Sequence, residues 1–232
     1  MLLLVFIIAI VLLKAIVTRY IFNKTTYHKI TNNSYYETIH NPGRKGEYQI
    51  FKHLQFLEKE GCKFLFNVYL PKDNDETTEI DVLLLTPKGI IVFESKNYSG
   101  WIFGNEKYKS WTQTLPQGRT SRKEHFFNPI MQNKLHVKCL KNIIGENCPV
   151  HPIVVFSEKC TLKNITFYSE DVQIVKLNSV CSAVSKVLCP TENSALSDDE
   201  LQRLYDLLYP YSQVSEQVKQ KHIRDIRSNH FE

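Results

Sequence analysis

Apolar positions fall into one long run at the start of the chain and several shorter runs further on. The first thirteen residues are all apolar, and the run resumes at residues 15–17 after Lys14. A helix of about 17 residues is at the short limit for crossing a bilayer. A cleaved signal peptide is the second interpretation, but no basic residues precede the run and no small-residue cleavage site follows it. A buried core helix is the third. We expect residues 1–22 to be a membrane anchor.

The charges beside this run predict how the chain is oriented. Residues 1–36 contain four basic side chains and no acidic one; the basic residues are Lys14, Arg19, Lys24 and Lys29. Basic residues next to a membrane span stay on the cytoplasmic side. We therefore expect a single-pass protein of the cell membrane whose domain faces the cytoplasm.

Beyond the anchor, apolar periodicity predicts helices and strands in turn. Residues 23–42 are polar and are expected to form a tether. A helix is predicted from about residue 43 to residue 60, where apolar residues recur at helical spacing. A second helix begins at Asn128, a good N-cap, with Pro129 in its first turn. A third follows the Ser197–Glu200 capping box.

The strands carry the candidate chemistry. Residues 80–86 and 90–96 are two apolar runs joined by a short turn, which predicts a hairpin. Side chains alternate along a strand, so Glu94 and Lys96 share a face, and the hairpin brings Asp81 beside them. Two carboxylates and an amine in one place suit a hard divalent metal and a lysine that handles a nucleophilic water. Further strands are expected at 64–70, 150–156 and 172–177, and a loop at 115–124.

Composition narrows the alternatives. Hydrophobic residues make up 43% of the 232 positions and charged residues 23%, as in folded globular proteins. The net charge is +5, with 29 basic against 24 acidic residues; without the four bases near the N-terminus, 25 remain against 24. A polycation that binds nucleic acid by charge alone is therefore disfavoured. The six cysteines form no CxxC pair or zinc-like spacing, which favours free thiols in a reducing compartment over disulfides.

Four short motifs in order resemble one family. They are Gly43-Arg-Lys-Gly-Glu47, Thr78-Glu-Ile-Asp81, Glu94-Ser-Lys-Asn-Tyr-Ser-Gly100 and Asn128-Pro-Ile-Met-Gln132. This arrangement, over about residues 43–156, resembles the nuclease-related domain of the PD-(D/E)xK nuclease superfamily. The resemblance implies an α/β fold with a restriction-endonuclease-like core, a central mixed β-sheet flanked by helices. Ile80 stands where the superfamily has proline, a residue that makes no metal contact there.

The resemblance also implies roles for five residues. Asp81 and Glu94 would bind Mg²⁺ or Mn²⁺, and Glu47 would add a third acid to the metal shell. Lys96 would orient or activate the attacking water, and Gln132 would orient the lysine or contact the substrate backbone. A lysine between carboxylates keeps its proton, so Lys96 is expected to act by charge and position. Taken singly, these residues could also be a turn cap, a surface ion pair, a helix-dipole acid or a solvated side chain.

Two functions from different classes follow. The first is a membrane-tethered, metal-dependent nuclease that hydrolyses phosphodiester bonds, of DNA rather than RNA. The second is a non-catalytic module that keeps the fold and binds nucleic acid or a protein partner. The expected organisation is an anchor at 1–22, a tether at 23–42, a nuclease-like domain at 43–156, an extension packed on the core at 157–210 and a charged tail at 211–232.

Overall fold

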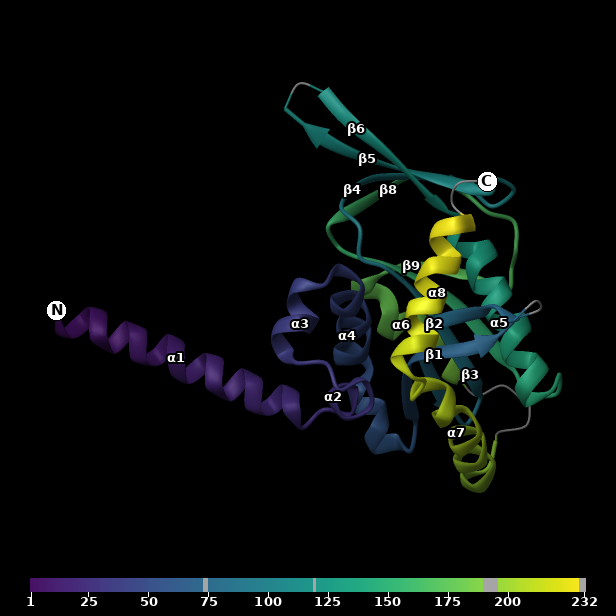
Figure 1. Ribbon diagram of the computed structural model, residues 1–232, viewed down its shortest axis with the longest axis horizontal. Helices are drawn as coiled ribbons and strands as arrows, with labels where there is room; N and C mark the ends of the chain where they lie inside the picture. Colours follow the sequence, from purple (N-terminus) through teal and green to yellow (C-terminus); the bar gives the residue numbers. More distant parts are fainter. Residues whose placement is uncertain (73–74, 119, 190–195, 230–232) are drawn as a thin grey trace.

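A five-stranded mixed sheet forms the centre of the molecule, with strand order β1-β2-β3-β7-β9 (Figure 1). A computed structural model describes residues 1–72, 75–118, 120–189 and 196–229. The strands of this sheet are β1 (Lys63–Pro71), β2 (Thr77–Thr86), β3 (Gly89–Lys96), β7 (Val150–Phe156) and β9 (Gln173–Lys176). Strands β1, β2 and β3 pair antiparallel, whereas β7 runs parallel to both β3 and β9.

A smaller sheet lies beside the first and has the order β6-β5-β4-β8. Its strands are β4 (Gly100–Asn105), β5 (Ser110–Gln117), β6 (Thr120–Phe127) and β8 (Cys160–Thr166). A separate core joins it to the main sheet: Trp111 is buried and stacks on Phe156 of β7, with ring centroids 6.3 Å apart. The two sheets therefore have a fixed relative position.

Helices cover the main sheet on both sides (Figure 1). The helical segments are α1 (Leu2–Asn23), α2 (Thr26–Thr31), α3 (Tyr35–His40), α4 (Pro42–Leu54), η1 (Gln55–Glu60), α5 (Pro129–Ile144), η3 (Leu177–Ser179), α6 (Val180–Leu188), α7 (Asp198–Ser212) and α8 (Glu216–Asn229). Helix α4 packs against β2 and β3, and α5 packs against β1, β2, β3 and β7. Helix α7 begins at the predicted capping box of Ser197 and Glu200. The predicted mixed sheet flanked by helices is confirmed.

The predicted hairpin is the centre of the core. Residues 82–85 of β2 and 90–93 of β3 are fully buried, as their uninterrupted apolar runs require. Gly89 closes the turn with φ of 115°, and a Cβ there would lie 2.3 Å from the carbonyl oxygen of Pro149. Only glycine fits this turn, because both the backbone conformation and the neighbouring chain exclude a side chain.

The segment at 23–42 is not a polar tether. It forms α2 and α3, whose N-caps are Thr25 and Ser34, the latter in a capping box with Glu37. Tyr27 of α2 is fully buried, and its ring packs edge-on against Phe66 of β1 at 4.9 Å. The sequence pattern did not reveal the apolar face of these helices, because each has only six residues and so shows no clear helical periodicity.

Two other segments also differ from expectation. The expected loop at 115–124 is the β5–β6 hairpin, whose strands pair from Ser110↔Phe127 to Gln117↔Thr120; Arg119 lies outside the described residues. Its outward side chains are polar, so the strands lacked an apolar signal. The charged tail contains helix α8, and residues 230–232 are outside the described part.

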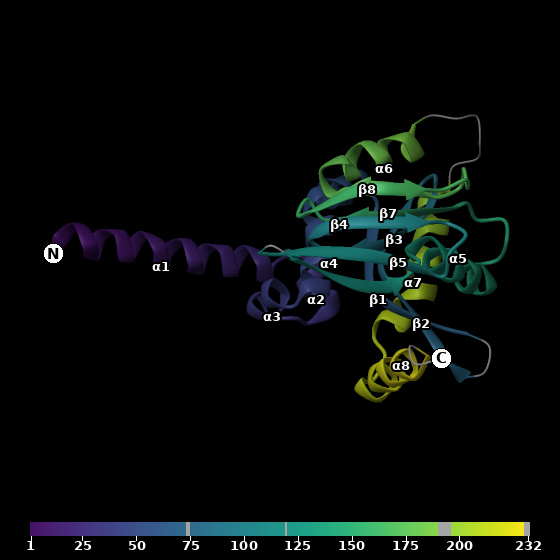
Figure 2. The same ribbon diagram turned by 90° about the horizontal axis from the view of Figure 1, so that it is seen from above.

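Helix α1 projects from the body (Figures 1 and 2). Residues 1–17 are exposed, and Phe22 in the last turn is buried against the core. Among the described residues, α1 is the one helix long and apolar enough to cross a membrane. All six cysteines are free, and four of them are buried. The free thiols were predicted.

Candidate functional site

Asp81, Glu94 and Lys96 meet at one end of the β2–β3 hairpin. The regular pairing ends at Val82↔Phe93, one step before Asp81 and Glu94. There Asp81 Oδ2 accepts a hydrogen bond from the backbone N–H of Ser95 at 2.7 Å. Lys96 Nζ donates to Glu94 Oε1 at 2.6 Å. The two strand ends are thus joined through the side chain of Asp81, and the lysine is paired with the glutamate of its own strand.

Helix α5 holds this pair from one face of the sheet. Its N-cap, Asn128, is fully buried and donates to the carbonyl oxygens of Glu106 and Tyr108 at 2.8 and 2.9 Å, which fixes where the helix begins. One turn later Gln132 Oε1 accepts from Lys96 Nζ at 3.1 Å. The predicted partnership of Gln132 with the lysine is therefore present as a contact.

His136, one further turn along α5, binds the other oxygen of Glu94. Its Nε2 lies 2.9 Å from Glu94 Oε2, and its Nδ1 lies 2.8 Å from the hydroxyl of Thr78. A carboxylate only accepts, so Nε2 carries the proton, and in the neutral ring Nδ1 accepts from Thr78. His136 was not predicted as a site residue; its i, i+4 spacing from Gln132 is the signal that places both on one face of the helix.

Helix α4 approaches the other face of the sheet. A Cβ on Gly46 would lie 2.3 Å from Ser95 Oγ, so glycine lets the helix pack closely on the end of β3. Asn97 Nδ2 also donates to the Pro42 carbonyl oxygen at 2.8 Å. This close approach buries Glu47, the next residue of the helix, which is only 6% exposed.

Glu47 belongs to a second cluster beside the first. Tyr27 donates through its hydroxyl to Glu47 Oε2 at 3.2 Å, and the side chain of nearby Asn67 acts to lower the pKa values of both Glu47 and Glu79. Tyr69 donates to Glu79 Oε1 at 2.8 Å, and His222 Nε2 lies 3.7 Å from Glu79 Oε2. These partners come from α2, β1 and α8, far from the motifs in sequence, and none of them was predicted.

Asn67 has a left-handed backbone, with φ of 49°. It interrupts the β1–β2 pairing between Phe66↔Val82 and Val68↔Ile80, opposite Asp81. Non-glycine residues adopt this conformation at a cost, and such positions gather at functional sites. Here the irregular backbone turns the amide toward Glu47 and Glu79.

Electrostatics separate the members of the site. Burial alone would raise the pKa of Glu94, but Lys96 and His136 outweigh it and lower that pKa. Burial alone would lower the pKa of Lys96, and Glu94 outweighs it and raises that pKa. Both shifts favour the ionised pair, with Lys96 protonated and Glu94 a carboxylate.

Asp81 and Glu47 are shifted the opposite way. Burial, followed by the charges of Glu94 and Glu47, raises the pKa of Asp81 well above its usual range. Burial, followed by the charge of Glu79, raises the pKa of Glu47 to about 7. Burial and mutual repulsion thus favour the protonated forms of Asp81 and Glu47 in the metal-free protein, and a bound divalent cation would favour their ionised forms.

The described residues contain no preformed group of three His, Cys, Asp or Glu side chains able to hold a metal ion. Mg²⁺ needs fewer protein ligands than this, since it binds through one or two carboxylates and keeps several waters. Each carboxylate offers about four lone-pair positions. The hydrogen bonds described above use one position on Asp81, at Oδ2, and two on Glu94, at Oε1 and Oε2, so the remaining positions could bind a cation. The oxygen donors of Asp81 and Glu94 therefore fit a hydrated divalent cation.

A cleft of about 600 Å³ adjoins this site. Gln132 and His136 line it, so it opens beside the side chains that contact Lys96 and Glu94. Its other walls come from the start of β2, the end of β6 and helix α8. A molecule in this cleft would contact Gln132 and His136, the two side chains that hold the ionised pair.

Comparison with known proteins identifies the region that carries the site. Residues 42–157 match the model of the nuclease-related domain. The chain is also 29% identical over 182 residues to an uncharacterised protein from Bacillus anthracis, a match that covers 78% of this chain and 82% of the relative. The matched domain contains the five predicted site residues and His136; α1, α2 and α8 lie outside it.

Proposed function

Because the chain belongs to the nuclease-related domain family, we propose that it is a metal-dependent nuclease that hydrolyses phosphodiester bonds of DNA. One observation carries the proposal: a protonated Lys96 is held between Glu94 and Gln132, beside the buried Asp81. Hydrolysis of a phosphodiester requires positive charge at the phosphoryl oxygens and a water poised for attack. This arrangement supports both requirements.

Asp81 and Glu94, with Glu47 as a third acid, are the residues that would hold Mg²⁺ or Mn²⁺. When bound, such a cation supplies Lewis-acid stabilisation of phosphoryl oxygens and lowers the pKa of a bound water. The carboxylate of Glu94 is already oriented for binding a cation, because Lys96 holds one of its oxygens and His136 holds the other.

Lys96 supplies the remaining positive charge. An ammonium group has three N–H donors, and the contacts to Glu94 and Gln132 use two of them. The third is left for a phosphate oxygen or the attacking water. Because Lys96 stays protonated, it stabilises developing negative charge and positions the water, and it does not remove a proton.

Cleavage assays on the full-length chain in detergent test this function. We expect Mg²⁺ or Mn²⁺ to support cleavage of at least one labelled substrate among single-stranded, duplex and branched DNA, and EDTA to abolish it. RNA of the same sequence serves as the comparison substrate. Cleavage that persists in EDTA, or that is confined to RNA, would contradict the proposal.

The alternative, a non-catalytic binding module, is supported by the raised pKa values of Asp81 and Glu47, since a protonated carboxyl does not hold a cation. In this case the wild-type protein binds nucleic acid or a protein partner, but no substrate is cut at any metal concentration. The same assays, with binding measured in parallel, distinguish the two functions.

We also propose that α1 tethers the domain to the cytoplasmic face of the cell membrane. The helix is apolar, and residues 1–17 are exposed. Two basic residues, Lys14 and Arg19, lie in its second half, and two more, Lys24 and Lys29, follow its last residue. Moving these charges outward costs about 2.3 kcal/mol per charge per 100 mV. A reporter that works only in the cytoplasm should be active when fused to the C-terminus. If only a reporter that works outside the cytoplasm is active, the proposed orientation is wrong.

A further inference from the structure

We propose that the cleft beside the catalytic side chains binds an unpaired nucleotide, so that the protein acts on single-stranded DNA or unpaired ends and not within an intact duplex. This inference rests on the proposed function, because it assigns the substrate of the same site. It is carried by the position of the cleft, by the chemistry of its walls and by its size.

The position of the cleft links it to the reacting groups. Gln132 and His136 form part of its wall and also contact Lys96 and Glu94. A nucleotide in the cleft would therefore contact Gln132 and His136, one side chain away from the ionised pair. No rearrangement of α5 is needed for this, because both side chains already face the cleft.

The walls combine an aromatic surface with positive charge. Phe126 and Phe127 at the end of β6 line the cleft, as do the basic Lys72 and Lys109 and one acidic residue, Glu79. Aromatic rings stack on the face of any base, and ammonium groups bind phosphates, which together make a sequence-tolerant site for a single strand. Phe126 packs against Tyr98 with ring centroids 4.8 Å apart, so Phe127 is the ring whose replacement tests stacking.

The size and the closed side of the cleft favour one strand. Its volume of about 600 Å³ lies within the range of about 300–1,000 Å³ found for small-ligand sites. Helix α8 closes one side, where His222 Nδ1 lies 3.0 Å from the hydroxyl of Thr77. In a duplex the bases are paired and stacked inside the helix, so a base reaches such a pocket only when it is unpaired.

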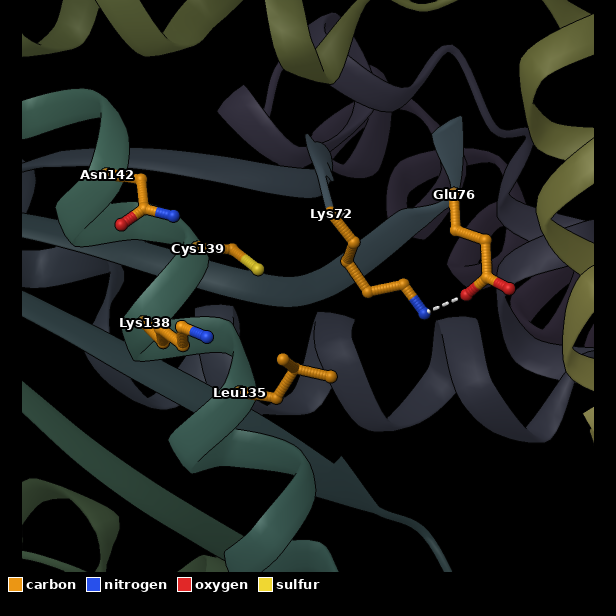
Figure 3. A pocket seen from close by; sticks show the side chains of 6 residues that line it. All are labelled: Lys72, Glu76, Leu135, Lys138, Cys139 and Asn142. Atoms are coloured by element: carbon orange, nitrogen blue, oxygen red, sulfur yellow. Dashed lines mark hydrogen bonds and ion pairs between the residues drawn. The ribbon is translucent and has the colours of Figure 1, made fainter. Parts of the chain in front are cut away.

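A smaller hollow of about 180 Å³ adjoins the cleft and shares Lys72 and Leu135 with it (Figure 3). Figure 3 shows Lys72 and Lys138 on opposite walls; Lys72 directly follows β1, and Lys138 belongs to α5. Lys72 is paired with Glu76 at 2.5 Å. These two ammonium groups offer binding positions for the next phosphates of a strand that leaves the cleft.

Binding measurements on the full-length chain in detergent test this inference. The probes are a short fluorescein-labelled single-stranded DNA and the same sequence as a blunt duplex, with Ca²⁺ in place of Mg²⁺. We expect the single strand to bind at least ten times more tightly than the duplex. Phe127→Ala should weaken single-strand binding roughly tenfold, because base stacking on an aromatic ring is lost.

Three further variants separate stacking from folding. Phe127→Leu keeps apolar bulk but removes the ring, so it should bind as weakly as Phe127→Ala, while Phe127→Trp should bind as the wild type does. Phe56→Ala removes an exposed phenylalanine outside the cleft and should have no effect. Equal or tighter binding of the duplex, or wild-type binding by both Phe127→Ala and Phe127→Leu, would overturn the inference.

The cleavage assay keeps this inference apart from the proposed function. If single-stranded DNA binds through Phe127 but nothing is cut, the catalytic proposal fails and the cleft assignment stands. If intact duplex is cut faster than single-stranded DNA, the catalytic proposal stands and the cleft assignment fails.

Discussion

At the scale of single residues, the site is a chain of buried hydrogen bonds from Thr78 through His136 and Glu94 to Lys96. The side chains of Glu94 and His136 are each only 2% exposed, so both are largely shielded from bulk water. Such a chain holds the carboxylate in one orientation, which is what an incoming cation requires.

Replacing His136 should therefore weaken metal use. We expect His136→Ala to raise the Mg²⁺ concentration needed for half-maximal cleavage by about 10- to 100-fold, the effect of losing a group that orients a metal ligand. The KM for DNA should change much less. His151→Ala is the matched control, since His151 bonds to the carbonyl oxygen of Lys88 at the opposite end of β3. An unchanged metal requirement with a lowered melting temperature would assign His136 a structural role only.

The raised pKa of Glu47 predicts how the metal-free protein responds to pH. Its pKa is about 7 in the folded state and near 4.5 in the unfolded state, so folding favours the protonated form. The stability that Glu47 contributes is present below about pH 4.5 and is lost as the pH rises to about 7. In EDTA, the melting temperature of Glu47→Gln relative to the wild type should therefore increase between pH 5 and pH 8. A constant difference across this range would contradict the burial and repulsion assigned to Glu47.

At the scale of elements, two helices on opposite faces fix the end of one hairpin. Gly46 lets α4 approach Ser95, and the Asn128 cap sets where α5 places Gln132. The motifs of the family thus have separate tasks: two of them position helices, and the other two supply the strand residues that the helices hold.

Part of this arrangement could be predicted from the sequence. Strand alternation is local, so the shared face of Glu94 and Lys96 and the turn that returns to Asp81 were evident. The contacts of Glu47 could not be predicted in this way, because Tyr27 and Asn67 reach it from separate elements. The tether prediction missed the capping box of Ser34 and Glu37, and only tertiary packing shows which face of α2 and α3 is buried.

At the scale of the whole molecule, the apolar helix α1 and the domain form a continuous structure. Phe22 in the last turn of α1 and Tyr27 in α2 are buried in the main core, whereas residues 1–17 are exposed. The boundary between anchor and domain thus lies near residue 18, and α2 and α3 belong to the domain.

Two truncations test this boundary. A fragment from Thr18 should remain soluble when membranes are removed and should melt near the temperature of the full chain. A fragment from Tyr36 loses Phe22 and Tyr27; burial of each large aromatic contributes about 3–5 kcal/mol, so its melting temperature should fall by about 10 °C or more. Equal melting temperatures for the two fragments would show that α2 is dispensable.

The cleavage rate of Lys96→Ala relative to the wild type, both in Mg²⁺, tests the central claim most directly. Lys52→Ala, which removes an exposed lysine of α4, is the control for lost charge. We predict that Lys96→Ala lowers the rate by at least about 100-fold, the effect of removing a group that stabilises transition-state charge, and that Lys52→Ala cuts at the wild-type rate. Cleavage by Lys96→Ala at the wild-type rate would show that hydrolysis does not occur at the Asp81, Glu94 and Lys96 site.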